Sequence, residues 1–217
     1  MIKLYGHPLS DYATKLKIAL LEKKIDFEEI KQYPSRESDY VKFSYTGRIP
    51  VIETENGVLG ESSAILEFIE EEFPAIPLLP ENKFERARIR QVGSIIENYI
   101  DLPARKVYAK YVAGKEFDSN DIESARIEIE RAIEALNSLN CFESYTASNQ
   151  FSFADCIALA IIPLVNDYLE VLTDIKVISE LNNFANYYER IMSEKTYMGR
   201  IEKQRKLLQK AIARVRK

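Results

Sequence analysis

The segment Thr46–Phe68 limits what this 217-residue chain can fold into more than any other stretch. Asn56 and Gly57 supply the positive-φ residues that a tight hairpin turn requires, and this dipeptide is a strong hairpin signal. Short strands are therefore expected on either side of it, at Val51–Glu55 and Val58–Glu61.

Both flanks of this hairpin leave backbone groups without partners. Pro50 cannot donate to a strand ladder and belongs at an edge or in a special turn, so the backbone of Ile49 is left free. After the second strand, Glu61, Ser62 and Ser63 precede an apolar helical periodicity, which is typical of a helix N-terminus. Unpaired amides and the positive end of the helix dipole face outward there. A small extended peptide carrying carboxylates could use both features.

The first thirty residues predict a βαβ unit. Strands expected at Ile2–Tyr5 and Phe27–Lys31 flank an apolar helical stripe that begins near Ser10 and ends near Lys23. This order implies a parallel strand pair joined by a right-handed crossover. With the hairpin and a helix beginning at Ser62, the full order becomes βαβ-ββα.

The second half of the chain predicts a different architecture. Three prolines within Phe73–Pro80 exclude a helix and indicate an extended linker. Beyond it, apolar residues recur at three- and four-residue spacing among helix formers. We therefore expect an α/β domain over residues 1–73, a proline-rich linker over 74–82 and an all-α domain over 83–217. The helices expected in the last domain are Phe84–Ala113, Ile122–Leu139 and Cys156–Leu164.

Composition and charge argue against several classes of function. The 46% hydrophobic and 29% charged residues are typical of a folded globular protein, and a net charge of −4 gives no general attraction to nucleic acid. No apolar run reaches the length of a membrane span, so we expect no membrane partner and a cytoplasmic location. Cys141 and Cys156 lack a CxxC spacing and are expected to be reduced. His7 is the single histidine, and a metal site is not expected.

The motifs, taken in order, resemble the cytosolic glutathione transferase family. Gly-Arg-Ile-Pro, the hairpin and Glu-Ser-Ser-Ala-Ile resemble its glutathione-binding half. The capping-box-like Ser152–Asp155 and the aromatic helix Phe184–Ile191 extend the resemblance into the second domain. It implies a thioredoxin-like fold for residues 1–73, glutathione as co-substrate, and conjugation to small hydrophobic electrophiles in detoxification. It also implies a homodimer.

The resemblance assigns roles at the glutathione site. In that family the proline is cis, the preceding residue pairs with the cysteinyl backbone of glutathione, and a Glu-Ser pair holds the γ-glutamyl end. These roles fall on Pro50, Ile49, Glu61 and Ser62. Arg48 replaces the glutamine usual in phi-class sequences, and either lies near the peptide backbone and glycyl carboxylate or points into solvent.

A thiolate stabiliser is expected at the first strand-helix junction, because the thiolate is the nucleophile and a free thiol titrates at roughly 8.5. The His-Pro-x-Ser run there most resembles the phi class, whose serine stabilises the thiolate, and Ser10 matches it. Ser10 is alternatively a plain helix N-cap. Tyr5 is the rival hydroxyl, because other classes place a catalytic tyrosine at the end of this strand, and Tyr12 is a third hydroxyl nearby.

The sequence defines the cation that binds the glycyl carboxylate and the electrophile pocket less precisely. Arg36 and Lys42 are candidates for the basic residue that meets the glycyl carboxylate. The electrophile pocket is expected between the domains, along a helix that carries Tyr99, Arg105, Tyr108 and Tyr111, although such tyrosines also suit ordinary packing. Two alternatives to conjugation are another glutathione-dependent reaction (isomerisation, dehalogenation or peroxide reduction) and a non-enzymatic interaction module associated with transcription or translation.

Overall fold

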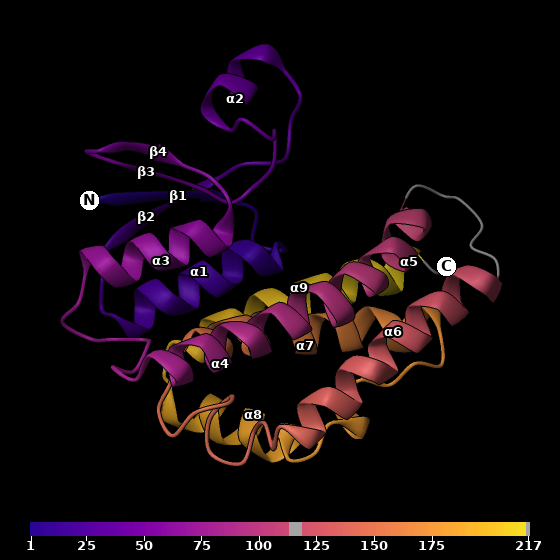
Figure 1. Cartoon of the computed structure of the whole chain (residues 1–217). Coiled ribbons are helices and arrows are strands. Elements are labelled where there is room, and N and C mark those ends of the chain that lie inside the picture. The colour runs from indigo at the N-terminus through magenta and orange to yellow at the C-terminus, as the bar shows by residue number, and fades with distance from the viewer. Residues whose placement is uncertain (113–118, 216–217) are drawn as a thin grey trace. The chain divides into compact units, whose positions relative to one another are not determined.

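The computed structural model describes residues 1–112 and 119–215 (Figure 1). Two compact units make up the chain, one over Met1–Leu79 and one that begins at Pro80. The domain limits inferred from the sequence stay a prediction, because a compact unit is no test of independent folding.

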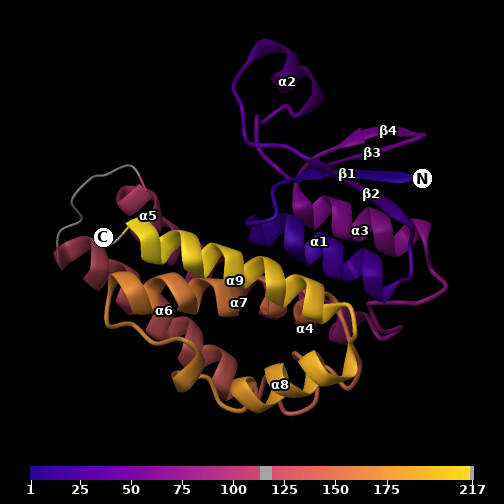
Figure 2. The same ribbon diagram turned by 180° about the vertical axis from the view of Figure 1, so that it is seen from behind.

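The first unit is the expected thioredoxin-like fold. Its elements are β1 (Ile2–Gly6), α1 (Asp11–Glu22), β2 (Phe27–Lys31), α2 (Ser38–Phe43), β3 (Val51–Thr54), β4 (Gly57–Leu59) and α3 (Ser62–Glu72). The strand order is β2-β1-β3-β4, with β1 and β2 parallel and the other two pairs antiparallel. Figures 1 and 2 show α1 and α3 on one face of the sheet and α2 on the other. Helix α2 was not predicted, and β4 ends two residues earlier than expected.

The core of this unit lies between the sheet and the helices α1 and α3. Strand residues alternate between the two faces of the sheet, so Ile2 and Leu4 are buried while Lys3 and Tyr5 are half-buried on the other face. The buried apolar residues of the two helices include Leu16, Ile18, Leu20, Ile65 and Ile69. This packing fixes the N-termini of both helices relative to the sheet.

A buried ion pair holds the proline-rich segment on the first unit. The Lys23 ammonium lies 2.6 Å from the Glu70 carboxylate and also donates to the Ile76 carbonyl at 2.7 Å. The Glu70 carboxylate accepts hydrogen bonds from the backbone amides of Leu78 and Leu79 at 3.0 and 2.9 Å. Each charge is thus compensated and hydrogen-bonded, which a buried ion pair needs in order to be tolerated.

The second unit is mostly helical, as expected. Its elements are α4 (Lys83–Ile95), the π-helix η1 (Ile96–Asp101), α5 (Leu102–Val112), α6 (Ser119–Ser138), α7 (Phe153–Leu172), the short 3₁₀-helix η2 (Ile178–Glu180), α8 (Phe184–Glu194) and α9 (Met198–Val215). The helix predicted at Phe84–Ala113 is present as α4, η1 and α5 in succession, although Ala113 itself lies outside the described residues. None of the helices in the described ranges is both long and apolar enough to cross a membrane.

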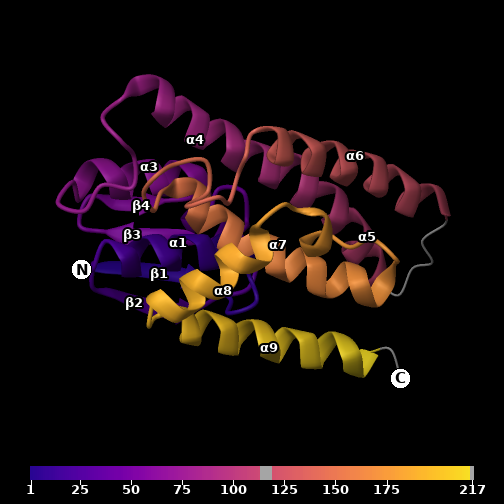
Figure 3. The ribbon, with the colours of Figure 1, turned by 90° about the horizontal axis from the view of Figure 1, so that it is seen from below.

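Helix α7 is the central helix of this unit (Figure 3). It packs against α4, η1, α5 and α9, and its first eleven residues are all buried. Ser152 and Asp155 form the expected capping box. The Asp155 carboxylate also accepts from the Thr146 amide at 2.8 Å and the Tyr187 hydroxyl at 2.7 Å. The start of α7 is thereby tied to the preceding loop and to α8.

Candidate functional site

Ser10 caps the N-terminus of α1. Its side-chain oxygen accepts a hydrogen bond from the Ala13 amide at 3.2 Å, and its own amide donates to the His7 carbonyl at 2.9 Å. Capping uses only a lone pair of the hydroxyl oxygen, so the hydroxyl proton remains available. In the described part of the chain this hydroxyl donates to no acceptor. A donor with an unused proton therefore lies at the positive end of a helix dipole.

The rival hydroxyl of Tyr5 is already engaged. It donates to a Glu53 carboxylate oxygen at 2.6 Å, and the other oxygen of that carboxylate lies 3.2 Å from the Lys3 ammonium. The hydrogen bond to Glu53 raises the pKa of Tyr5 to about 12, with smaller contributions from burial and from the charge of Glu53. Its ring packs edge-on against Phe43, with centroids 4.6 Å apart. The third hydroxyl residue, Tyr12, has its ring 5.0 Å from the Lys15 ammonium.

The peptide bond between Ile49 and Pro50 is cis, as the resemblance implies. Just before it, the Arg48 carbonyl accepts hydrogen bonds from the Tyr40 hydroxyl at 3.0 Å and the Ser44 hydroxyl at 2.7 Å. Within residues 1–112 and 119–215, neither the amide nor the carbonyl of Ile49 is hydrogen-bonded. The loop therefore holds a free backbone edge in a fixed position.

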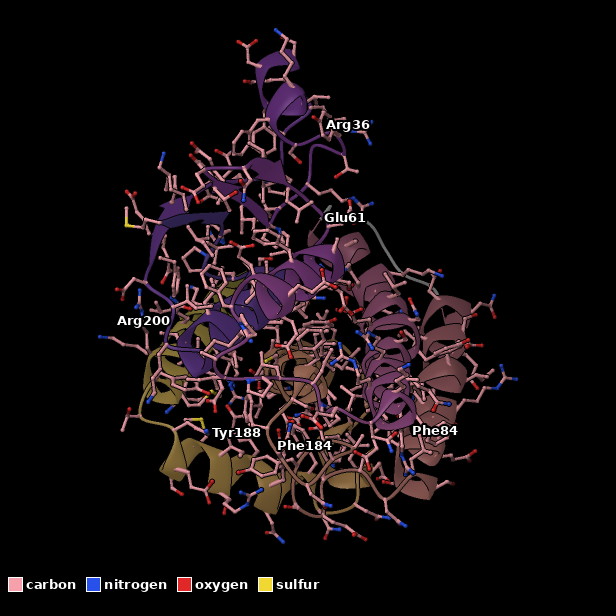
Figure 4. The ribbon with its side chains drawn as sticks, turned by 60° about the vertical axis from the view of Figure 1, so that its left-hand side comes forward. Arg36, Glu61, Phe84, Phe184, Tyr188 and Arg200 are labelled. Carbon is pink, nitrogen blue, oxygen red and sulfur yellow. The ribbon has the colours of Figure 1, made fainter. Side chains whose placement is uncertain are left out.

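The N-terminus of α3 has an unusual backbone. Glu61 is exposed and has φ 61° and ψ 104°, outside the regions that L-residues prefer. Ser62 begins the helix and is buried, and the Ser63 hydroxyl lies 3.3 Å from the buried Lys15 ammonium of α1. Figure 4 shows Glu61 at the start of α3 and Arg36 in the segment before α2.

The topology brings these features to one end of the sheet. Tyr5 near the end of β1 lies opposite Val51 at the start of β3, so the turn that leads to Ser10 and the cis bond at Pro50 share that end. Helix α1 packs beside α3, which adds the N-terminus at Ser62. The residues predicted to bind the peptide and the thiolate are thus gathered in one unit.

The predicted basic residues differ in their surroundings. Arg48 and Arg36 are exposed, and neither forms an ion pair with another described residue. Lys42 pairs with Asp39 at 3.1 Å, with both side chains in solvent. Of the three, Arg48 is nearest in sequence to the cis bond, which it precedes by one residue.

The residues expected along the electrophile pocket lie on η1 and α5. Tyr99 is 47% exposed and available to a ligand. Arg105 is committed to the buried Asp101, which it contacts through two nitrogens at 3.0 to 3.2 Å. Tyr108 packs on Tyr168 with ring centroids 5.0 Å apart. The side chain of Tyr111 lies outside the described residues.

Sequence reasoning missed the supports of the cis segment. Helix α2 supplies Tyr40, and the residue that ends it supplies Ser44. Gly47 has φ 67°, and a Cβ there would lie 2.4 Å from the Ser35 carbonyl oxygen, so no other residue type fits without rearrangement. A glycine three residues before a proline was the available signal for this turn.

Both cysteines are free and buried. Burial raises the pKa of the Cys141 thiol to about 11, so it does not act as a nucleophile near neutral pH. Among the described residues, no three histidine, cysteine, aspartate or glutamate side chains are grouped to hold a metal ion.

Comparisons with known proteins agree with this geometry. The family model described as "Glutathione S-transferase, N-terminal domain" matches residues 4–81. A glutathione S-transferase of Pseudomonas putida is 34% identical over 93% of this chain and 91% of its own length. A maleylacetoacetate isomerase of Dictyostelium discoideum is 32% identical over 72% of this chain and 73% of its own. Isozyme E7 of Drosophila melanogaster glutathione S-transferase superposes with a TM-score of 0.82, at 17% identity, over 99% of this chain and 96% of its own. The identity to the Pseudomonas enzyme over nearly the whole length, together with the thioredoxin-like unit, makes this chain a member of the glutathione S-transferase family.

Proposed function

We propose that this protein conjugates the thiolate of reduced glutathione to a small hydrophobic electrophile, and that Ser10 stabilises the thiolate. Membership of the family makes it a glutathione transferase with glutathione as co-substrate. The observation that carries the serine role is the hydroxyl of Ser10, which caps α1 with a lone pair and keeps its proton for another acceptor.

The proposed chemistry needs a modest electrostatic effect. Lowering the thiol pKa by about two units corresponds to about 2.7 kcal/mol. A hydroxyl donor at a thiolate and the N-terminus of α1 together reach this magnitude. With an aryl halide, the thiol first loses its proton to solvent. The thiolate sulfur then forms a bond to the halogen-bearing carbon, and the halide leaves with the electron pair of the broken bond.

The remaining parts of glutathione are assigned to groups of the site that could bind them. The unpaired backbone of Ile49, held before the cis Pro50, suits the cysteinyl backbone of glutathione. Glu61 and Ser62 at the N-terminus of α3 suit the γ-glutamyl end, whose ammonium and carboxylate need a carboxylate and amide donors. The exposed Arg48 suits the glycyl carboxylate. A homodimer, a cytoplasmic location and a role in detoxification complete the proposal.

Isomerisation is the second candidate reaction. The relative named maleylacetoacetate isomerase supports it. The glutathione site would be the same, and glutathione would be regenerated rather than consumed. Product analysis with an unsaturated diacid and with an aryl halide separates the two reactions.

The deciding experiment combines calorimetric titration of reduced glutathione with a spectroscopic titration of the bound thiolate. Ser10→Gly removes the hydroxyl but costs the helix cap only a few tenths of a kcal/mol, so it separates catalysis from capping. We expect Ser10→Gly to bind glutathione, with the bound thiol pKa returning towards 8.5 and kcat falling about 100-fold. Ser10→Thr keeps a hydroxyl and should retain a low thiol pKa.

Two outcomes would contradict the proposal. A Ser10→Gly variant with unchanged rate would reduce Ser10 to a helix cap. No binding of glutathione at millimolar concentration to the wild-type protein would exclude the enzyme assignment and favour an interaction module that keeps the fold alone.

A further inference from the structure

A cavity adjoins the turn that leads to Ser10. It has a volume of about 190 Å³ and lies within the first unit, between the turn after β1, helix α1 and the end of β2. Leu4, Ala13 and Ile30 supply apolar walls, and His7 contributes from the turn. At roughly 30 Å³ per water, this space has room for a small organic group rather than a single water.

The cavity and the proposed glutathione groups lie on opposite sides of β1. In the order β2-β1-β3-β4, the cis Pro50 precedes β3, which neighbours β1 on one side. The cavity is lined from β2, which neighbours β1 on the other. The turn that leads to Ser10 follows β1 itself and separates the two. The cavity is linked to the proposed thiolate site through this turn, because His7 and Pro8 line the cavity and Ser10 follows two residues after Pro8.

The charges around the cavity leave one cation uncompensated. The Lys17 side chain is only 3% exposed and is neutralised by Glu29, whose carboxylate lies 2.6 Å from the ammonium. The other lysine of the lining, Lys31, forms no ion pair within residues 1–112 and 119–215. Its ammonium lies 5.3 Å from the ring centre of Tyr33, a residue that is 56% exposed.

His7 adds a neutral donor beside this cation. Its Nδ1 accepts a hydrogen bond from the Leu9 amide at 3.2 Å, which leaves the proton on Nε2. Burial and the charge of Lys31 lower the pKa of His7 below its usual 6.5, so the imidazole is neutral at pH 7. The ring also packs against Tyr33, with centroids 4.5 Å apart. Cation, donor and exposed aromatic ring thus form one cluster.

We propose that this cavity binds the carboxylate end of an aromatic electrophile, with Lys31 as the counter-charge and His7 as hydrogen-bond donor. Tyr33, which is outside the lining but contacts both residues, is the stacking surface. The inference rests on the proposed function, whose substrate class it narrows to small aromatic acids. Because Lys17 and Glu29 neutralise each other, Lys31 gives the lining of the cavity a net positive charge.

The test compares 3-nitrobenzoate with 3-nitrobenzamide, which has nearly the same shape and no charge. Binding of each is followed through the imidazole C2 proton of His7, which is unambiguous because the chain has one histidine. We expect the acid to bind about fivefold more tightly than the amide and to shift this signal. Raising the salt to 1 M should remove most of the preference.

Two lysine variants localise the effect. Lys31→Gln should reduce the ratio of acid to amide affinity to about one, and Lys31→Arg should preserve it. Lys24→Gln is the matched control, because Lys24 is also exposed but follows the far end of α1, which is about 18 Å long at 1.5 Å per residue. It should keep the wild-type ratio.

The proposal is overturned if the wild-type protein shows no preference for the acid, or if Lys31→Gln leaves the preference intact. Measuring the conjugation rate distinguishes an error about the cavity from an error about the transferase function. Conjugation of 4-chloro-3-nitrobenzoate should exceed that of its amide about fivefold in kcat/KM. Equal turnover of acid and amide would refute the substrate class and keep the transferase. If the protein binds the acid but does not bind glutathione, the cavity does not serve an electrophile of glutathione, and the proposal is refuted.

Discussion

The Tyr5 hydroxyl and the Glu53 carboxylate are joined by a 2.6 Å hydrogen bond across β1 and β3. The bond directs the tyrosine proton at Glu53 and raises the pKa of Tyr5 to about 12, so this hydroxyl is unsuited to stabilise a thiolate near neutral pH. Tyr5→Phe should therefore change kcat/KM for glutathione conjugation by less than about threefold and lower stability by about 1 kcal/mol. A loss near 100-fold in steady-state rate would instead identify Tyr5 as the thiolate donor.

Gly47→Ala should destabilise the fold and weaken glutathione binding together. The new methyl group would lie 2.4 Å from the Ser35 carbonyl oxygen, at a φ of 67° that alanine avoids. We expect a loss of about 2 kcal/mol in urea unfolding, because strain and steric clash add. Gly199→Ala is the control, because a Cβ at Gly199, within α9, meets nothing within 4 Å. Equal stabilities for the two variants would contradict the role of Gly47.

The buried ion pair of Lys23 and Glu70 predicts a strong coupling between the two residues. Glu70→Gln leaves the Lys23 ammonium without a counter-charge and should cost about 3 kcal/mol in unfolding free energy. Lys23→Met should be similarly costly, because it leaves a buried carboxylate. The double variant should recover at least 1 kcal/mol relative to the sum of the single changes. Additive effects in this double-mutant cycle would show that the pair is not coupled.

Acidification should weaken the fold through His7. Its pKa is lowered in the folded protein by burial and by Lys31, so the unfolded chain binds more protons near pH 6. The contribution of His7 to stability is therefore complete above pH 6.5 and is lost as the pH falls through the lowered folded pKa. Proton NMR of the single imidazole gives this pKa directly. The unfolding free energy of His7→Gln in urea should depend less on pH between pH 7.5 and 5 than that of the wild type. A measured His7 pKa above 6.5 would contradict the prediction, because protonation of His7 would then stabilise the fold.

Arg48→Gln tests the proposed contact with the glycyl carboxylate. Because Arg48 is exposed, we expect a loss of about 1 kcal/mol at most in glutathione binding, or roughly fivefold. Titration with glutathione amidated at its glycyl carboxyl group should show no difference between wild type and variant. Lys24→Gln, which removes an exposed cation beyond the C-terminal end of α1, is the control and should bind glutathione normally. A loss that persists with the amide would assign Arg48 to some other part of the peptide.

Local signals allowed most of the elements of the first unit to be predicted from sequence. Asn56-Gly57 correctly indicated the hairpin, but the turn residues are Glu55 and Asn56, because Gly57 already pairs with Thr54, and of the two predicted positive-φ residues only Gly57 has one. The six-residue α2 was missed, because so short a helix shows no clear periodicity. The prediction for β4 was too long, because the strand ends at Leu59 and Glu61 has a positive φ, which is uncommon for glutamate and therefore not predictable from the residue type.

Long-range contacts explain what remained unpredicted. The sequence predicted that the helix beginning near Cys156 ends at Leu164. In the structure, α7 begins at Phe153 and continues past Pro163 to Leu172. It continues because burial against neighbouring helices outweighs the hydrogen bond that the proline removes. The acceptor for Tyr5 stands 48 residues away in the chain, which no local pattern reveals. The roles of Ser10 and Arg48 stay predictions, since they concern a ligand rather than the fold.

The backbone of Glu61 has a consequence for how this site can change by mutation. A glycine would adopt φ 61° and ψ 104° with less strain, so the fold alone favours losing the side chain at this position. The Glu61 carboxylate, which is proposed to bind glutathione, therefore lowers the stability of the fold relative to a glycine at this position. Stability and binding therefore make opposite demands on one residue, and a chain drifting away from glutathione would be expected to relax here first.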